Sequence, residues 1–377
     1  MKIEQRIMDP SGSWEASSGS LEGLRPQFAF VFGARALLEN ASILAEIRGV
    51  YPGARLVIAS ACSILGVEIC EHSLGVTAVA LERTSVDFAT LPIPRYEDSF
   101  SVACELARTL RRPDLAHVFV LADEHYANGT ELARGFNETL PAGVAMTGGL
   151  ASEEANLVTT LLGLDTAPEE ARMVAVGFYG RDLRVGIGVS SGWVPFGPER
   201  VVTRAEGNTL FDLDGQSALG LYKKYLGAQA ALLPAAALRF PLSMTPRDGG
   251  QTLVRASLWI DEANQSMHLA GDIAIGSRVR FLRASYDDLI DGAGRAAELS
   301  RGNQSPDLAI CVGCIGRKIV LGLRTEEEIE NIGAVFGAAT ALTGFFSHGE
   351  LAPVAGDPRC RLHNETMTIT TFREDVA

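Results

Sequence analysis

The chain has 377 residues, of which 47% are hydrophobic and 21% are charged, and its net charge is −13. This length predicts two domains or two intimately packed halves rather than one core. The acidic balance argues against nucleic acid and anionic membrane surfaces as partners, because both attract a basic protein face.

Residues 1–25 are expected to form a mobile leader, because the segment 11–20 is rich in serine and glycine. The leader lacks the apolar core of a signal peptide. No apolar stretch of the chain reaches the roughly 20 residues that a membrane-spanning helix needs. The six scattered cysteines are therefore expected to be reduced thiols, and the expected location is the cytoplasm.

One pattern occurs three times: an apolar run, a helical stretch, and a second apolar run that ends in a glycine-containing turn with an acid. The helical stretches are expected near 39–49, 129–139 and 325–338. Repetition of one such unit predicts strand–helix–strand building blocks. The flanking runs are FAFVFGAR (28–35) and ARLVIASACSILGVE (54–68), AHVFVLAD (116–123) and AGVAMTGGLASEE (142–154), and DLAICVGCIGR (307–317) and ATALTGFFSHGE (339–350).

Consecutive strand-like runs follow the second repeat, and Gly180-Arg181-Asp182 predicts a hairpin turn between two of them. A series of consecutive strands that follows alternating strands and helices predicts mixed sheets. The expected fold is mixed α/β, with two similar halves whose mixed sheets are flanked by helices. After the leader, we expect an N-terminal module over 26–205 and a C-terminal module over 206–377.

The three acid-bearing turns predict one shared site. Ligands of such sheets sit in the crevice at the strand ends, so the turns at 62–68, 147–153 and 346–350 are expected to converge. The candidate ligand-binding residues are Trp193, Arg317 and seven residues on or beside these turns: Cys62, Glu68, Gly148, Gly149, Phe345, Phe346 and Glu350.

His348 is the candidate metal ligand among the histidines. It lies in GFFSHGE at the end of the third repeat, where its imidazole is expected to face a pocket lined by Phe345, Phe346 and glycines. A neutral imidazole in an apolar cavity is a suitable iron ligand, and Glu350 would orient the ring. The alternative is a histidine that hydrogen-bonds to Glu350 or to the backbone.

Trp193, in GWVPFG (192–197), has two interpretations. Its large flat surface and N–H donor suit ligand stacking, but a rigid corner that packs over the core is favoured.

The cysteine and histidine spacings can be interpreted as a zinc site or as buried thiols. Cys311-x-x-Cys314 with Cys360-x-x-His363 imitates a zinc site, but residues three apart on a strand point to opposite faces, so buried thiols are expected. No G-x-S-x-G, G-x-G-x-x-G or Walker A motif is present.

The chain resembles the FIST family of ligand-sensing proteins from about residue 28 to 372. The motifs that carry the resemblance are YPGARLVIASACSILGVEI (51–69), GGLAS (148–152), SSGWVPFGPERVVTRAEGNTLFDLDGQSAL (190–219), CIGR (314–317), GFFSHGE (344–350) and LHNET (362–366). Two positions depart from the family pattern. Val67 separates a Gly–Glu pair that is usually adjacent, and His348 replaces an aromatic residue.

The resemblance implies a non-catalytic intracellular sensor domain, with the two modules above as its N- and C-terminal FIST modules. Such domains bind small molecules, amino acids among them, and act on histidine kinases, cyclic-di-nucleotide enzymes or chemoreceptors. Some stand-alone members resemble haem-based nitric-oxide sensors. This chain is also expected to stand alone, so its output would pass in trans to a histidine kinase or a cyclic-di-GMP enzyme.

We therefore expect a cytoplasmic sensor in two-component or related signalling. The leading ligand is haem, with His348 as its axial ligand and nitric oxide as the sensed molecule. The first alternative is an amino-acid or small-metabolite sensor without haem. The alternative from another class is a hydrolase or transferase that uses Cys314 and Arg317, with His348 or His363 as base. A homo-oligomer is left open.

Overall fold

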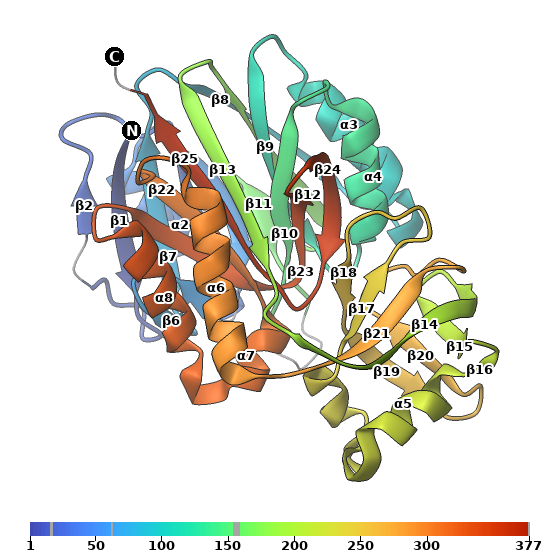
Figure 1. Ribbon diagram of the computed structural model, residues 1–377. Helices are drawn as coiled ribbons and strands as arrows, with labels where there is room; N and C mark the ends of the chain where they lie inside the picture. Colours follow the sequence, from blue (N-terminus) through green and yellow to red (C-terminus); the bar gives the residue numbers. More distant parts are fainter. Residues whose placement is uncertain (16–17, 62, 154–158, 376–377) are drawn as a thin grey trace.

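The computed structural model describes residues 1–15, 18–61, 63–153 and 159–375. Within these residues the strands form three sheets, which we call sheets A, B and C. Sheets A and B make up the larger body, and sheet C forms a smaller unit beside it (Figure 1). The mixed α/β class predicted from the sequence is confirmed.

Sheet A comes from the N-terminal part of the chain. Its strands, in spatial order, are β11 (Leu162–Leu164), β4 (Arg55–Ser60), β3 (Phe28–Gly33), β7 (Leu74–Ala80), β1 (Lys2–Met8) and β2 (Ser18–Ser20).

Sheet B combines strands from both ends of the chain. Its main path is β13 (Leu183–Ser190), β25 (Met367–Glu374), β22 (Leu308–Cys314), β23 (Ala341–Val354), β10 (Ala145–Ala151), β9 (Leu115–Asp123), β12 (Arg172–Tyr179) and β8 (Ser85–Pro92). The long β23 also pairs with β24 (Asp357–His363) and with β5 (Ser63–Leu65), which pairs with β6 (Ile69–Glu71).

Sheet C is antiparallel and comes from the middle of the chain. Its path is β18 (Leu253–Arg255), β17 (Leu242–Thr245), β21 (Arg278–Arg283), β14 (Val194–Glu206), β15 (Thr209–Leu213), β20 (Ser266–Leu269) and β19 (Ser257–Asp261), with β16 (Gln216–Ser217) beside β15. The predicted module boundary at 205–206 falls at the end of β14.

Helices cover the outer faces of the sheets. The α-helices are α1 (Arg35–Leu38), α2 (Ala41–Val50), α3 (Ser99–Leu110), α4 (Gly129–Thr139), α5 (Ala218–Leu226), α6 (Tyr286–Arg301), α7 (Ile315–Leu321) and α8 (Glu326–Phe336). Short 3₁₀ turns are η1 (Tyr96–Asp98), η2 (Gly227–Leu232), η3 (Ala235–Arg239) and η4 (Gly322–Arg324). Among the described residues, no helix is long and apolar enough to cross a membrane.

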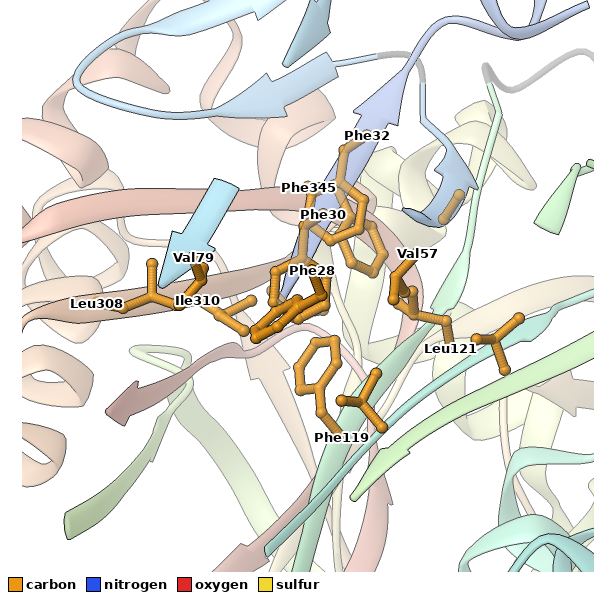
Figure 2. Close-up of a cluster of buried hydrophobic side chains, with 14 of the residues drawn as sticks. Phe28, Phe30, Phe32, Val57, Val79, Phe119, Leu121, Leu308, Ile310 and Phe345 are labelled. Atoms are coloured by element: carbon orange, nitrogen blue, oxygen red, sulfur yellow. The ribbon is translucent and has the colours of Figure 1, made fainter. Parts of the chain in front are cut away.

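Sheets A and B stack face to face, which explains why their strands are apolar on both sides. Alternate residues of β3, namely Phe28, Phe30 and Phe32, pack with Phe119 and Phe345 of sheet B (Figure 2). The intervening residues of β3 pack against α2, since successive strand side chains point to opposite faces. On the outer face of sheet B, α3 and α4 cover one half and α6 and α8 the other.

All three predicted strand–helix–strand repeats form. In each, the two strands run parallel and are neighbours: β3 with β4, β9 with β10, and β22 with β23. A helix connects each pair, as expected when parallel strands are joined by a crossover. The second and third repeats then meet, because β10 and β23 pair antiparallel.

Two local expectations are wrong. The start of the predicted leader is not mobile, because Lys2–Met8 form β1 and pair along their whole length with β7. The predicted hairpin at 180–182 does not form, because β12 pairs with β8 and β9 whereas β13 crosses to pair with β25. Both errors concern strands whose partners lie far away in the sequence.

Candidate functional site

A cavity of about 550 Å³ lies between sheet B and sheet C, and we call it the first cavity. Clefts between two structural units are common ligand sites. Its walls come from the connection between β9 and α4, the ends of β10 and β24, strands β19 and β20, and the start of α7. Most of the lining is apolar, and the polar exceptions include Glu124, Asn208, Asp272, His348, Asn364 and Glu365.

Asn364 and Glu365 stand out among the lining residues. They lie in the turn between β24 and β25, and both are almost fully buried. Neither the amide of Asn364 nor the carboxyl of Glu365 has a hydrogen-bond partner among the described residues. Such groups are rare, because an unsatisfied buried polar group costs about 1–3 kcal/mol. Both side chains line the first cavity, so a ligand there could supply the missing partners.

The backbone around Glu365 is held in a left-handed conformation, with a φ of 58°. Trp193 fixes this turn by donating its indole N–H to the Glu365 carbonyl oxygen at 2.9 Å. Gly316 leaves room for the carboxyl, since a Cβ there would lie 2.3 Å from its Oε1. Trp193 itself packs into a hydrophobic cluster and does not line the cavity. Trp193 therefore packs in the core, as in the interpretation favoured from the sequence, and its indole N–H also positions the turn of Glu365.

Arg317 is fully buried and connects this turn to two helices. Its Nη1 donates to the Glu365 carbonyl oxygen at 3.4 Å, and its Nη2 donates to the Leu289 carbonyl oxygen of α6 at 2.7 Å. Its Nε donates to Glu328 Oε1 of α8 at 3.0 Å. Arg317 was predicted to contact the ligand directly, but it does not line the cavity. Its guanidinium instead joins the cavity wall to α6 and α8.

Glu350 is equally buried but fully satisfied. Ser347 Oγ donates to its Oε1 and Thr366 Oγ1 to its Oε2, each at 2.7 Å. Glu350 lies inside β23 opposite Gly149 and does not line the first cavity. Burial raises the pKa of Glu350 to about 8. Burial, with the nearby Glu350, also raises the pKa of Glu365 to about 8, against the opposing effect of Arg317.

His348 lines the first cavity, as predicted, but its surroundings differ from the prediction. Its Nδ1 contacts the carboxylate of Glu124, which lies just after β9, rather than Glu350. Burial lowers the pKa of His348 to about 4, so the ring is neutral at neutral pH. If the proton of the neutral ring is on Nδ1, toward Glu124, then Nε2 is presented as an acceptor or a metal ligand.

Phe345 and Phe346 do not face the first cavity. Adjacent strand residues point to opposite sides, and each of these rings is completely buried in a different hydrophobic cluster. The prediction that they pack against a ligand is therefore wrong.

The glycines of the second repeat also serve packing. A Cβ at Gly148 would lie 1.8 Å from the Val120 carbonyl oxygen, and one at Gly149 would lie 2.7 Å from Val312 Cγ1. Neither glycine lines the first cavity. Residues 145–151 and 341–354 continue as strands β10 and β23, so the two predicted turns are parts of paired strands.

The first predicted turn lies elsewhere. Glu68 lines a second cavity of about 240 Å³, together with Cys70 and residues of β1 and β23. The predicted convergence of all three turns on one site is therefore wrong for this turn. Cys62 and Glu154 lie outside the described residues.

Cys314 lines the first cavity, but its environment opposes ionisation. Burial, with the nearby Glu350 and Glu365, raises the pKa of the thiol well above its ordinary value. A nucleophilic cysteine needs the opposite shift. His363 bonds through Nε2 to the Ala352 carbonyl oxygen at 3.0 Å, so this nitrogen is engaged. Cys311 and Cys360 pack into different hydrophobic clusters, and no three or more His, Cys, Asp or Glu side chains of the described residues form a metal-binding group.

Comparison with known proteins identifies the family. The sequence model described as the FIST N domain matches residues 27–216, and that of the FIST C domain matches residues 218–353. The chain belongs to the FIST family. FIST domains are associated with the sensing of small ligands in signal transduction, which agrees with a cavity whose polar groups lack partners.

Comparisons with individual proteins add nothing to this assignment. No protein of curated function matches the chain. One solved structure in the comparison is a putative 2,3-dihydroxybenzoate-specific isochorismate synthase, DhbC, from Bacillus anthracis. It is 13% identical, with a TM-score of 0.14, over 100% of this chain and 91% of that chain. A likeness this weak carries no argument about fold or function.

Sequence reasoning missed Asn364 and Glu365 as site residues, although they lie within the LHNET motif that supports the resemblance. A polar Asn–Glu pair between two strongly apolar strands was the available signal. Glu124 carried a similar signal, because it directly follows the apolar run of β9. No sequence signal marked Trp259 or Asp272 as site residues, because only the packing of sheet C beside sheet B brings them to the cavity.

Proposed function

We propose that this protein senses a small ligand that binds in the first cavity and passes the signal to a separate protein. The observation that carries this proposal is the buried and unpartnered Asn364–Glu365 pair on the cavity wall. A stable fold keeps such groups unsatisfied mainly where function requires them. The ligand class that suits them offers hydrogen-bond donors to the carboxyl and both donor and acceptor to the amide.

The contacts of Arg317 provide a route for the signal. A ligand that pulls on Glu365 acts on a turn whose carbonyl oxygen is bonded to Arg317. Arg317 in turn contacts α6 through Leu289 and α8 through Glu328. A shift of the turn therefore changes the packing of α6 against α8. In line with the family resemblance, we propose that a histidine kinase or a cyclic-di-GMP enzyme reads this change in trans, in the cytoplasm.

Extraction of bound small molecules tests the proposed site. The wild type, Glu365→Gln and Glu374→Gln are purified in parallel, checked for folding by thermal unfolding, denatured, and analysed by mass spectrometry. Glu374→Gln is the matched control, because Glu374 is also a buried carboxyl but accepts hydrogen bonds from residues 82–84 and does not line the cavity. We expect a molecule that accompanies the wild type and the control but not Glu365→Gln. Equal amounts in all three proteins would contradict the proposal.

Haem with nitric oxide sensing is the second candidate, and the His348–Glu124 contact favours it. A cavity-lining imidazole whose Nδ1 faces a carboxylate matches the usual arrangement of a metal-bound histidine. His348 would hold the iron, and haem would supply a site for a diatomic gas. The charge of the cavity suits haem less well. Its described lining residues include Glu124, Asp272 and Glu365 but no lysine or arginine to pair with the propionates.

An absorption spectrum after haem reconstitution tests this candidate. If His348 is the axial ligand, His348→Ala loses or shifts the Soret band, whereas His72→Ala and His125→Ala keep it. An unchanged band in His348→Ala, or none in the wild type, removes His348 from the role. The hydrolase or transferase alternative has less support, because the Cys314 thiol is held protonated.

A further inference from the structure

We infer that the ligand of the first cavity is an organic amine with an apolar body, bound as its ammonium ion and carrying no carboxylate of its own. This inference rests on the proposed function and names the chemical class that the same site takes. It rests on the charges of the cavity wall, on the unpartnered groups at its end, and on the aromatic and aliphatic side chains at its mouth.

The wall carries several carboxyl groups but, among its described residues, no permanent cation. Glu124, Asp272 and Glu365 line the cavity, and no lysine or arginine is among the described lining residues. Arg255, the nearby buried cation, does not line the cavity. It donates to the carbonyl oxygens of Val254, Leu362 and Asp272, and its charge acts on the Asp272 carboxyl. A ligand carboxylate would therefore be desolvated beside three carboxyl groups without a cationic partner in the described lining, whereas an ammonium group finds carboxyl oxygens there to pair with.

The buried end of the site matches an ammonium group. Glu365 offers two carboxyl oxygens without hydrogen-bond partners, and Asn364 adds an unpartnered amide oxygen. An ammonium group has three N–H donors and no acceptor. The raised pKa of Glu365 means that its carboxyl is protonated in the empty site at neutral pH, so it releases this proton to solvent when it pairs with the ammonium. The resulting hydrogen bonds join charged groups and contribute more than neutral ones.

The mouth of the site matches an apolar body. Tyr96, Leu258, Trp259 and Ile319 line the cavity, and each is between 47% and 57% exposed. The Trp259 ring is fixed in place, because it stacks on His268 with ring centres 3.4 Å apart and an interplanar angle of 6°. Exposed apolar side chains that gather around one opening mark a binding surface. Trp259 also offers an electron-rich face to a cation.

Matched probe sets test the inference. Isothermal titration calorimetry compares 2-phenylethylamine with L-phenylalanine and 2-phenylethanol, and 3-methylbutylamine with L-leucine and 3-methylbutanol. Within each set the body is constant, while the carboxylate is added or the ammonium is replaced by a hydroxyl. We expect at least one amine to bind at least tenfold more tightly than its amino acid and its alcohol. Glu365→Gln should weaken that amine at least tenfold, and Glu374→Gln, at a buried carboxyl away from the cavity, less than twofold.

The outcomes separate this inference from the proposed function. An amino acid or an alcohol that binds as tightly as its amine overturns the amine assignment, and so does the failure of both amines to bind. Neither result touches the proposed function, which the extraction experiment decides. If that experiment yields an anionic molecule that depends on Glu365, the sensor site stands and the amine inference is wrong.

Discussion

Glu350 inside β23 and Glu365 in the turn between β24 and β25 are two carboxyl groups with the same burial and opposite surroundings. Glu350 accepts hydrogen bonds from Ser347 and Thr366, whereas Glu365 has no side-chain partner among the described residues. The first lies in the sheet, and the second lines the first cavity. Burial alone therefore does not distinguish these two carboxyls, whereas hydrogen-bond satisfaction and contact with the cavity do.

The largest effect is expected from Arg317, which ties the turn of Glu365 to α6 and α8. Arg317→Met leaves Glu328 buried without its cation and should lower the free energy of unfolding by about 3–5 kcal/mol. Denaturant unfolding measures this loss. The double variant Arg317→Met/Glu328→Met should recover part of it, since no carboxyl is then left unpaired. A loss below about 1 kcal/mol would mean that the buried pair does not hold this region together.

The same substitution at both carboxyls tests the comparison directly. Glu350→Met leaves the donors of Ser347 and Thr366 without an acceptor and should cost about 2–3 kcal/mol of unfolding free energy. Glu365→Met removes an unsatisfied group and should raise the unfolding free energy by about 1 kcal/mol while abolishing ligand binding. Chemical unfolding of both variants shows whether each substitution raises or lowers the free energy of unfolding. Equal destabilisation by the two substitutions would contradict the distinction drawn between them.

The pH dependence of stability should sharpen the comparison. The folded-state pKa of Glu365 is raised to about 8, so the folded protein holds a proton that the unfolded chain releases between about pH 4.5 and pH 8. The contribution of Glu365 to the free energy of unfolding therefore falls as pH rises through this window, by at most about 1.4 kcal/mol per pH unit. Glu350, Arg317 and Cys314 face or influence the same carboxyl.

Unfolding curves at pH 5, 6.5 and 8 measure this dependence. Glu365→Met should make the change of unfolding free energy with pH less negative than in the wild type, because one of the carboxyls with a raised pKa is gone. The pH dependence of stability that is due to Glu350 should remain in this variant. Identical slopes for the wild type and Glu365→Met would show that the Glu365 carboxyl does not titrate in this range.

The smallest effect is expected from Trp193, which holds the Glu365 carbonyl oxygen. Trp193→Phe keeps an aromatic ring in the cluster but removes the N–H donor, so the free energy of unfolding should fall by about 0.5–1.5 kcal/mol. Ligand affinity should fall with it, because the turn is less firmly placed. A stability loss without any change in affinity would show that the turn does not need this bond to bind.

The repeats were predictable from the sequence because each one is local. Long apolar runs separated by a helical stretch specify β3 with β4, β9 with β10, and β22 with β23 without reference to the rest of the chain. The positions of β1 and β13 were not predictable, since their partners β7 and β25 are chosen by tertiary packing. The crossing of β13 also joins the two predicted modules in one sheet.

The site was only partly predictable for the same reason. His348 was found because a histidine among glycines and aromatic residues is unusual, and it does line the cavity. The ligand-facing role of Glu365 depends on the absence of a hydrogen-bond partner, which no sequence pattern displays. The acids that were chosen instead, Glu350 and Glu68, follow apolar runs just as clearly. One is satisfied within the sheet, and the other lines the second cavity.

Hydrogen exchange of the ligand-loaded and ligand-stripped protein tests the central claim most directly. If the ligand binds between sheets B and C, the backbone amides of 362–366 and 258–272 should exchange more slowly in the loaded protein. The amides of 63–70 at the second cavity should be unchanged. Protection at 63–70, with none at 362–366, would contradict the assignment of the first cavity as the sensory site.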